Sequence, residues 1–508
     1  MSTVNEPSGV SKSGKWAALG AAILGWMFDG FEMGLFPLVA DPALRDLLQT
    51  ENTGETGKWI GIITAGFLVG AATGGVLFGW LGDRIGRVRA MALSILTYSL
   101  FSGLCGLADS ATTLLVFRIL ASLGMGGEWA LGVSLVMELW PGKSRGWLAG
   151  LIGAASNVGF VLVAVVSMFL IQILGSLQQI LLNIGLSQSQ VDSLSSNGGW
   201  RILLMCGALP ALLTFIIRLF VPESEKWTEE KEKGSTSKWA TVDLLGVLIG
   251  SLGPIGMIAI WADNRVPTSV RIIGTIIGLL VAIVGYLYPV TRYLKRMEED
   301  HNGQKLVGAD GQPVRKLMLI GALLSGVALL GTWGSLQWAA PWAASLTQDS
   351  GISHGKEWTQ IALGMGAIIG TFLAALAGHA FGRRITYFGL CLLALISIQV
   401  FYQTNTEFGA WFLITGFLAG GTTAAFYGWL PLYLPELFPT SVRATGQGFA
   451  FNFGRILAAV SSLQTGVLMN QVFNGNYAKA CSVMACVYVV GLVVIWLAPE
   501  TRGKDLIE

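Results

Sequence analysis

The chain has 508 residues, of which 53% are hydrophobic and only 12% are charged. Because charged residues make up about 25% of a typical soluble domain, this composition excludes a soluble globular protein and favours a polytopic membrane protein. The formal net charge of +2 indicates neither a nucleic-acid partner nor an acidic one. The five cysteines and three histidines lack the spacing of metal ligands, so we expect no metal and no cofactor.

Apolar runs follow one another along the chain, separated mostly by short polar breaks. A transmembrane helix needs about 20 predominantly apolar residues, and we expect six such spans in each half of the chain with two inserted helices between the halves. The expected spans are 17–40, 58–80, 90–108, 112–137, 146–173, 201–221, 239–261, 269–291, 317–346, 358–381, 386–403, 409–434, 444–470 and 478–498. The fold class is therefore an all-α polytopic membrane protein.

Three regions follow from these spans: a six-helix bundle in 1–221, a linker in 222–316 that holds the inserted helices, and a second bundle in 317–508. Lysines and arginines gather in the loops on one side of the membrane, which predicts that both termini are cytoplasmic. We expect the protein to lie in the inner or plasma membrane of the cell. We expect no cleavable signal peptide, because the first apolar run continues to spanning length. The Ser/Gln/Gly-rich segment 174–199 is expected to be a partly ordered external loop.

The two halves share sequence features that indicate a tandem duplication. "MELWPGKSRGW" around Glu138 and "PELFPTSVRAT" around Glu436 both place a proline three residues and an arginine seven residues after the glutamate. Parallel repeats of this kind are typical of transporters whose substrate site lies near mid-membrane between the repeats.

The segment "GWLGDRIGR", residues 79–87, strongly resembles the G-x-L-G-D-R-x-G-R loop of the major facilitator superfamily. "FRILASLGMGGEW", "PESEKW" and "PETRGK" resemble the sugar-porter and metabolite:proton symporter branches of that superfamily. The resemblance implies two six-helix repeats, alternating access and a gating role for the loop. The expected gating residues are Gly79, Gly82, Asp83, Arg84, Gly86, Arg87, Glu138, Arg145, Glu436, Arg443 and Arg383.

Asp83 can accept hydrogen bonds from helix N-terminal amides or from Arg145 across the loop. Such contacts would hold an inner gate shut in one state and break in the other. The alternative is that the loop only anchors the protein through its positive charges. The second copy of the loop has His379 where the first has Asp83, so we expect its latch to be weaker or differently protonated.

Ionisable side chains inside a bilayer are costly unless they are paired or hydrated, so each suggests a function. At ~1.5 Å per residue, Asp29 lies roughly 18 Å from the cytoplasmic side and Arg118 within roughly 3 Å of the same level. The resemblance implies that they pair, since the arginine of "FRILASLG" matches the partner of a span-one aspartate in proton-coupled sugar porters. We expect Asp29 to carry the coupling proton; the alternative is a permanent ion pair that holds two helices together.

Two further carboxylates accompany this pair. Glu32 shares the helix face of Asp29 and either shares the proton or lines a wet vestibule. Glu128, in "GMGGEW", matches a Gly-Gly-Glu of the metabolite:proton symporters, which implies coupling or gating; the alternative is a hydrogen bond to a neighbouring backbone.

Arg455 lies ~17 Å into its span and can recognise a carboxylate or phosphate, although it could instead pair with a span-one carboxylate. Sugar porters carry glutamines where this chain has Gly153, Ala322 and Leu323, which counts against a hexose because buried hydroxyls need partners. Aromatic walls and one arginine suit a small organic anion. The expected substrate-binding residues are Arg455, Asn452, Trp333, Gln337, Trp338, Thr422, Thr423 and Tyr427.

These observations predict a proton-coupled secondary transporter, working as a monomer in the lipid bilayer, for a small organic anion or related metabolite. Its partners would be that small molecule and protons. One alternative is a sugar:proton symporter. Another is a nutrient receptor that keeps the fold without coupled transport. No nucleophile, metal or phosphate-loop arrangement suggests an enzyme.

Overall fold

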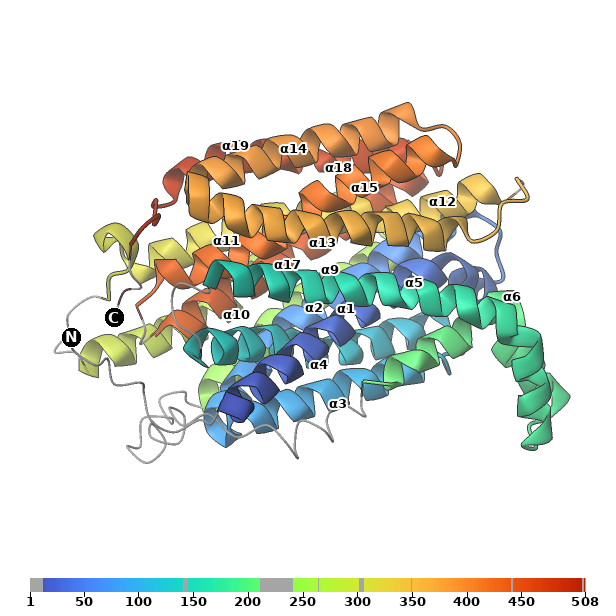
Figure 1. Cartoon of the computed structure of the whole chain (residues 1–508), viewed down its shortest axis with the longest axis horizontal. Helices are drawn as coiled ribbons and strands as arrows, with labels where there is room; N and C mark the ends of the chain where they lie inside the picture. The colour runs from blue at the N-terminus through green and yellow to red at the C-terminus, as the bar shows by residue number, and fades with distance from the viewer. Residues whose placement is uncertain are drawn as a thin grey trace.

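The computed structural model of the chain describes residues 12–139, 145–210, 241–263, 265–300, 306–348, 350–439, 442–504 and 507. Within these ranges the secondary structure is helical, apart from one isolated bridge between Val307 and Pro313. The helices lie roughly along one axis and form an elongated bundle (Figure 1). Eleven helices of the described part are long and apolar enough to cross a membrane, and Ala111–Gly127 is a shorter apolar stretch. The all-α membrane fold expected from the sequence is confirmed.

The first half consists of α1 to α6, which extend beyond most of the expected spans. Their bounds are α1 Lys12–Leu48, α2 Thr53–Ile85, α3 Arg87–Cys105, α4 Ala111–Leu139, α5 Arg145–Asn183 and α6 Gln188–Met205. Gly86 joins α2 to α3 with φ of 110°. Gly382, which follows His379 by three residues as Gly86 follows Asp83, joins α13 to α14 with φ of 95°. Both positions require a left-handed backbone that glycine adopts without strain, so the two loops share their turn geometry.

The second half consists of the helices from α11 to α19, three of whose expected spans are divided. The bounds are α11 Val314–Gly334, α12 Ala339–Thr347, α13 Gly355–Phe381, α14 Arg383–Thr404, α15 Ala410–Ala424, α16 Phe426–Tyr433, α17 Arg443–Val467, α18 Tyr477–Ala485 and α19 Val487–Val494. The halves meet where α13 packs on α5 and where α17 packs on α2.

The span expected at 317–346 is broken between α11 and α12. Ser335 leaves helical geometry, with φ of −127° and ψ of −63°, and a 3-10 turn follows at Leu336–Trp338. The carbonyl oxygens freed by the break find donors: Thr465 Oγ1 lies 2.6 Å from the Gly334 oxygen and Tyr402 OH 2.7 Å from that of Ser335. Non-helical backbone at membrane depth is tolerated where protein satisfies it, so this break is a stable feature of the bundle.

The segment expected to be a loop at 174–199 is mostly helical, which corrects the sequence interpretation. Helix α5 continues to Asn183 and α6 begins at Gln188, and this hairpin projects from one end of the bundle (Figure 1). Asn197 in the kink of α6 donates a 3.1 Å hydrogen bond to Asp46 at the end of α1. Serine, glutamine and glycine residues interrupt the apolar residues of 174–199, so apolar length alone did not mark these helices.

The two inserted helices are present as α9, Thr241–Ala262, and α10, Thr268–Asp300. They pack against each other, α9 packs on α2, and both contact α17. Tyr286 OH lies 2.7 Å from Thr73 Oγ1 of α2, and Lys58 Nζ donates to the Ala262 oxygen at 2.7 Å. The hairpin therefore lies across the seam formed by one helix from each half.

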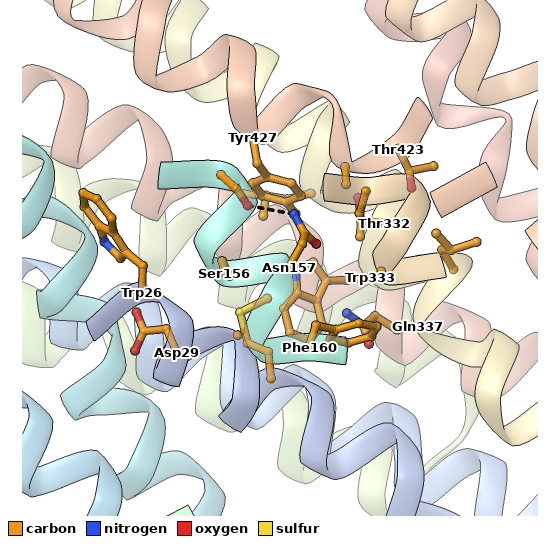
Figure 2. A pocket seen from close by; sticks show the side chains of 18 of the residues that line it. Trp26, Asp29, Ser156, Asn157, Phe160, Thr332, Trp333, Gln337, Thr423 and Tyr427 are labelled. Atoms are coloured by element: carbon orange, nitrogen blue, oxygen red, sulfur yellow. Dashed lines mark hydrogen bonds between the residues drawn. The ribbon is translucent and has the colours of Figure 1, made fainter. Parts of the chain in front are cut away.

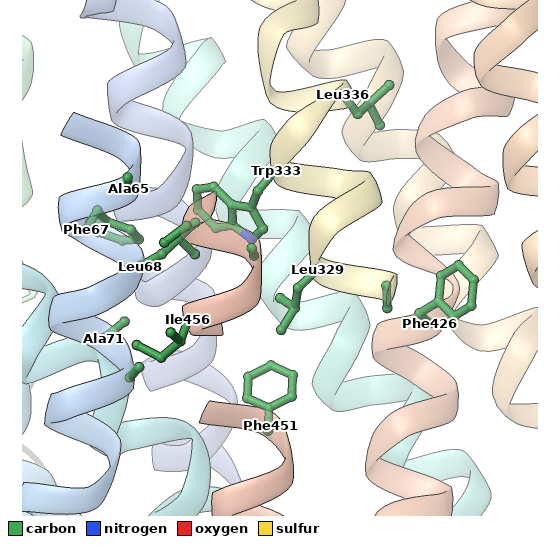
Figure 3. Close-up of a cluster of buried hydrophobic side chains, with 14 of the residues drawn as sticks. Ala65, Phe67, Leu68, Ala71, Leu329, Trp333, Leu336, Phe426, Phe451 and Ile456 are labelled. Atoms are coloured by element: carbon green, nitrogen blue, oxygen red, sulfur yellow. The ribbon is translucent and has the colours of Figure 1, made fainter. Parts of the chain in front are cut away.

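The centre of the bundle is built from large apolar side chains of α2, α11 and α17. Figure 3 shows Phe67 of α2, Trp333 of α11 and Ile456 of α17 converging on one cluster. The rings of Phe67 and Trp333 lie 5.7 Å apart, within the range of favourable aromatic contacts. This cluster forms one wall of the cavity described next.

Candidate functional site

A cavity lies between the two halves, lined by residues of both. Figure 2 shows Trp26 and Asp29 on one side of it and Phe160, Trp333 and Gln337 on the other. Its walls are mainly aromatic and aliphatic, with a few polar side chains. The charged side chains among its described lining residues are Asp29 and Arg455, so every other polar contact to a ligand there would be neutral.

Asp29 of α1 and Arg455 of α17 face this cavity from opposite halves, and their charges attract each other across it. Asp29 is 7% exposed and Arg455 8% exposed. The second possibility raised for Arg455, an interaction with a span-one carboxylate, thus has a counterpart in the structure. A cavity that holds one carboxylate and one guanidinium is electrically balanced until a proton or an anion enters.

Arg455 is held by α17 and α2. Its Nη1 donates to Asn452 Oδ1 at 3.1 Å and to the Ala71 oxygen at 3.3 Å, and its guanidinium carbon lies 4.9 Å from the ring centre of Phe451. Asn452 is 2% exposed and does not line the cavity. It therefore acts behind Arg455, orienting the guanidinium, and not as a direct wall of the cavity as the sequence suggested.

The partner of Arg118 is Glu32, not Asp29 as expected. Arg118 Nη1 donates to Glu32 Oε1, and Ser102 Oγ of α3 donates to Glu32 Oε2. Both side chains of the ion pair are at most 2% exposed. A Cβ on Gly207 would lie 2.2 Å from Ser102 Oγ and 3.1 Å from Glu32 Oε2, so this glycine leaves room for the buried pair. The depth estimate could not separate two carboxylates less than one helical turn apart.

The other expected substrate residues divide into three groups. Trp333, Gln337, Thr423 and Tyr427 line the cavity. Trp338 instead lines a smaller adjoining cavity. Thr422 faces away, since its Oγ1 lies 2.6 Å from Ser397 Oγ of α14; the expectation that it contacts substrate was wrong because adjacent helix residues point about 100° apart. The side chain of Glu128 lies outside the described residues.

Several lining residues were not singled out from the sequence. They are Trp26, Met33, Phe67, Met125, Ser156, Asn157, Phe160, Thr332 and Phe451. Asn157 donates a 2.8 Å hydrogen bond to the Gly153 oxygen on α5. The only available signal was the pair Ser156 and Asn157 within an otherwise apolar span, and position alone could not show that they face inward.

Of the three positions where sugar porters carry glutamine, only Gly153 lies at the cavity among the described residues. Gly153 lines the cavity, and a Cβ there would lie 3.1 Å from the Thr371 side chain and from the Tyr427 oxygen. A longer side chain at this position has little space. Ala322 and Leu323 do not line the cavity, and Leu323 is exposed.

The loop motif of the first half is described through its backbone only. The side chains of Asp83, Arg84, Arg87, Glu138 and Arg145 lie outside the described residues. Gly82 accepts the N–H of Gly86 at 3.2 Å, which closes the end of α2, while Gly79 has open space around it.

The corresponding loop of the second half forms a connected network. Arg383 donates to Glu436 at 2.9 and 2.6 Å, and Thr501 donates to the same carboxylate at 2.6 Å. Arg443 donates to the Ile507 oxygen at 2.7 Å. His379, the residue expected to weaken this latch, is exposed.

Glu500 closes this network at the start of α14. Its Oε1 accepts the N–H of Arg383 at 2.9 Å and its Oε2 that of Arg384 at 3.0 Å. Burial alone would raise the pKa of Glu500, but these amides and that of Arg502 hold the pKa below its ordinary value. A carboxylate at a helix N-terminus is stabilised in this way.

At the opposite end of the bundle, α13 bridges to the first half through polar contacts. Gln360 Nε2 donates to the Gly34 oxygen of α1 at 3.2 Å and to the Phe160 oxygen of α5 at 2.8 Å. Lys356 Nζ donates to the Leu38 oxygen at 2.6 Å. Ser167 Oγ of α5 donates to Glu357 Oε1 at 2.9 Å. Separation of the halves at this end must break these bonds.

Comparisons with known proteins agree with this architecture. The family model "Major Facilitator Superfamily" matches residues 20–462. The chain is 27% identical over 487 residues to the "Probable 4-methylmuconolactone transporter" of Cupriavidus pinatubonensis, covering 95% of this chain and 90% of the relative. It is 26% identical over 485 residues to the niacin transporter NiaP of Acinetobacter baylyi, covering 95% and 93%.

Among solved structures, the proton:xylose symporter XylE bound to 6-bromo-6-deoxy-D-glucose superimposes with a TM-score of 0.65 at 19% identity, covering 98% of each chain. At that identity the likeness concerns the fold. The family match over most of the chain confirms the resemblance read from the loop motif. The chain belongs to the Major Facilitator Superfamily of membrane transporters.

Proposed function

We propose that this chain carries a small organic anion with a planar or unsaturated portion across the membrane, together with a proton. The observation that carries the proposal is Arg455, a cation held inside an aromatic cavity between the two halves. A guanidinium can bind a carboxylate through two parallel hydrogen bonds, and aromatic walls suit a planar ligand. The relatives named for a muconolactone and for niacin transport support a substrate of this size.

Asp29 is the proposed carrier of the coupling proton. While Asp29 is ionised, its charge balances Arg455 across the cavity, and an entering anion would leave the site with net negative charge. Protonation of Asp29 removes that excess, so proton and anion favour each other's binding. By linkage, each raises the affinity for the other by the same factor.

Residues outside the cavity have supporting parts in this proposal. Asn452 orients Arg455, and Glu32 with Arg118 joins α1 to α4. Glu128 and the first-half loop with Asp83, Arg87, Glu138 and Arg145 keep the coupling and gating roles that the family resemblance implies. The positive-inside pattern supports a cytoplasmic position for both termini. The regions 1–221, 222–316 and 317–508 are the proposed bundle, linker and bundle.

A sugar:proton symporter is the second candidate, favoured by the fold shared with XylE. The cavity offers few convergent side-chain amides: Gln337 and Asn157 line it, and Asn157 is engaged with the Gly153 oxygen. The lack of room beside Gly153 also argues against the glutamine that sugar porters carry there. A receptor without coupled transport does not require a carboxylate such as Asp29 beside Arg455, because it has no proton to couple to the anion.

Uptake by reconstituted full-length protein tests the proposal. Proteoliposomes would be supplied with radiolabelled nicotinate, benzoate or xylose, with and without an inward proton gradient. We expect gradient-dependent accumulation of a carboxylate and none of xylose. Accumulation of xylose alone would establish the sugar alternative, and saturable binding without uptake would favour the receptor.

A further inference from the structure

A second, smaller cavity adjoins the central one. It shares four lining residues with the central cavity, namely Met33, Phe67, Trp333 and Gln337. Apart from Arg118, its remaining lining residues lie nearer the end of the bundle away from the chain's final residues: Phe36 and Pro37 on α1, Ile60 and Thr64 on α2, and Trp338 and Pro341 after the break that follows α11. The two cavities therefore follow one another along the axis of the bundle.

The charged side chain among the described lining residues of this smaller cavity is Arg118. Its guanidinium carbon lies 5.1 Å from the ring centre of Phe36 and 4.6 Å from that of Phe67. Glu32 lines neither cavity, although it binds Nη1 of Arg118. The arginine thus stands between its carboxylate partner on one side and an open aromatic space on the other.

Part of the guanidinium of Arg118 has no hydrogen-bond partner. The side chain is only 2% exposed, and its buried Nε makes no hydrogen bond within the described residues. The side-chain oxygen of Gln337, at the boundary of the two cavities, is likewise buried without a donor there. Buried polar groups of this kind are normally satisfied, so both point to a ligand that enters this space.

We propose that the smaller cavity is a second anion-binding subsite, in which Arg118 binds the carboxylate of a planar ligand between Phe67 and Trp338. This proposal rests on the proposed function, because the same class of organic anion would bind both in this subsite and at Arg455 in the central cavity. Glu32 positions Arg118 and lowers its affinity for anions by balancing its charge. A neutral side chain at position 32 therefore strengthens binding at this subsite.

Isothermal titration of full-length protein in nanodiscs with nicotinate tests the subsite. We expect Glu32→Gln to bind at least about tenfold more tightly at a second site, equivalent to roughly 1.4 kcal/mol, and to take up two equivalents of nicotinate. The amide keeps the shape of Glu32 and a hydrogen bond to Ser102. Thr64→Phe in the Glu32→Gln background fills the smaller cavity without changing its charge, and we expect it to remove the second equivalent only.

The double variant Glu32→Gln/Arg118→Gln controls for folding, because it leaves no unpaired charge in the bundle, and it should also lose the second equivalent. A single equivalent in Glu32→Gln that is abolished by Arg455→Gln and unaffected by Thr64→Phe would overturn the subsite and leave the proposed function intact. No binding of nicotinate to wild type or any variant would overturn the subsite, and uptake of xylose alone by the same wild-type preparation would separately reject the proposed substrate class.

Discussion

Arg118 of α4 forms its ion pair with Glu32 and leaves Asp29, three residues earlier on α1, in the central cavity with Arg455. Two carboxylates on one helix are thereby assigned to two different arginines, one from each half of the protein. The directly bonded pair of Glu32 and Arg118 lies within the first half, whereas Asp29 and Arg455 face the central cavity from opposite halves. The first half thus contains a directly bonded carboxylate–arginine pair, while among the described residues the central cavity holds a carboxylate and an arginine without a direct bond between them.

The buried pair predicts a characteristic stability pattern. Arg118→Gln leaves Glu32 uncompensated and should destabilise the protein by about 3–5 kcal/mol, since breaking a buried pair costs more than removing it. The double variant with Glu32→Gln should recover most of this loss. Thermal unfolding of Arg118→Gln, Glu32→Gln and the double variant in nanodiscs measures the coupling, and simply additive losses would contradict a direct pair.

Replacement of Asp29 should uncouple transport from the proton gradient. In Asp29→Asn we expect uphill uptake to disappear, so that the accumulation ratio at zero membrane potential falls to about 1, while substrate exchange continues. The physical reason is that the amide cannot carry the proton that balances an incoming anion. Uptake and counterflow in the same proteoliposomes measure both, and unchanged proton flux with full uphill uptake in Asp29→Asn would reject its role.

Arg455 should determine the affinity for an anionic substrate. Arg455→Gln removes a charge-assisted interaction of about 1.5–3 kcal/mol, so we expect KM to rise about 10- to 100-fold. Asn452→Leu should raise KM less, because the guanidinium remains but loses its orienting acceptor. Concentration series of initial uptake rates distinguish the two, and an equal effect of both variants would indicate that Arg455 acts only through packing.

The polar contacts of α13 should control opening at the end of the bundle away from the chain's final residues. Gln360→Met keeps the size of the side chain but removes hydrogen bonds to the Gly34 and Phe160 oxygens. We expect the halves to separate there more often, by about 1–2 kcal/mol for two neutral bonds. Distances between spin labels on α1 and α13 measure the change. Gln403→Met, at an exposed site on α14, serves as the matched control and should leave them unchanged.

The second-half loop should lose stability in acid. Because the pKa of Glu500 is below 4.5 in the folded protein, its contribution is present above that value and is lost as the pH falls through the lower, folded pKa. Glu500→Gln should lower the unfolding temperature at pH 7 by about 2 °C or less, given partial exposure. Wild type and variant should converge as the pH falls through the folded pKa of Glu500, and a difference that does not shrink as the pH is lowered would contradict the prediction.

The approximate helix positions and the duplicated loop could be predicted from the sequence because they depend on local patterns. Apolar length marks a span regardless of its neighbours, and Gly86 and Gly382 mark turns that only glycine adopts easily. The helices within 174–199 were not predicted, because serine, glutamine and glycine residues in this segment led us to expect a loop. The pairing of Glu32 with Arg118 was missed because it depends on the relative height and rotation of two helices, which sequence spacing leaves uncertain by more than a turn.

By itself the sequence determined that this is a duplicated helical membrane protein with a few buried charges, because hydrophobic length, loop charge and glycine placement act within each segment. Only the tertiary structure decided which carboxylate meets which arginine, that Thr423 faces the cavity while Thr422 does not, and that Asn452 lies behind Arg455. Those relations arise from side chains of distant helices packing into the same space. They follow from the arrangement of the helices as a whole and are not encoded in any one of them.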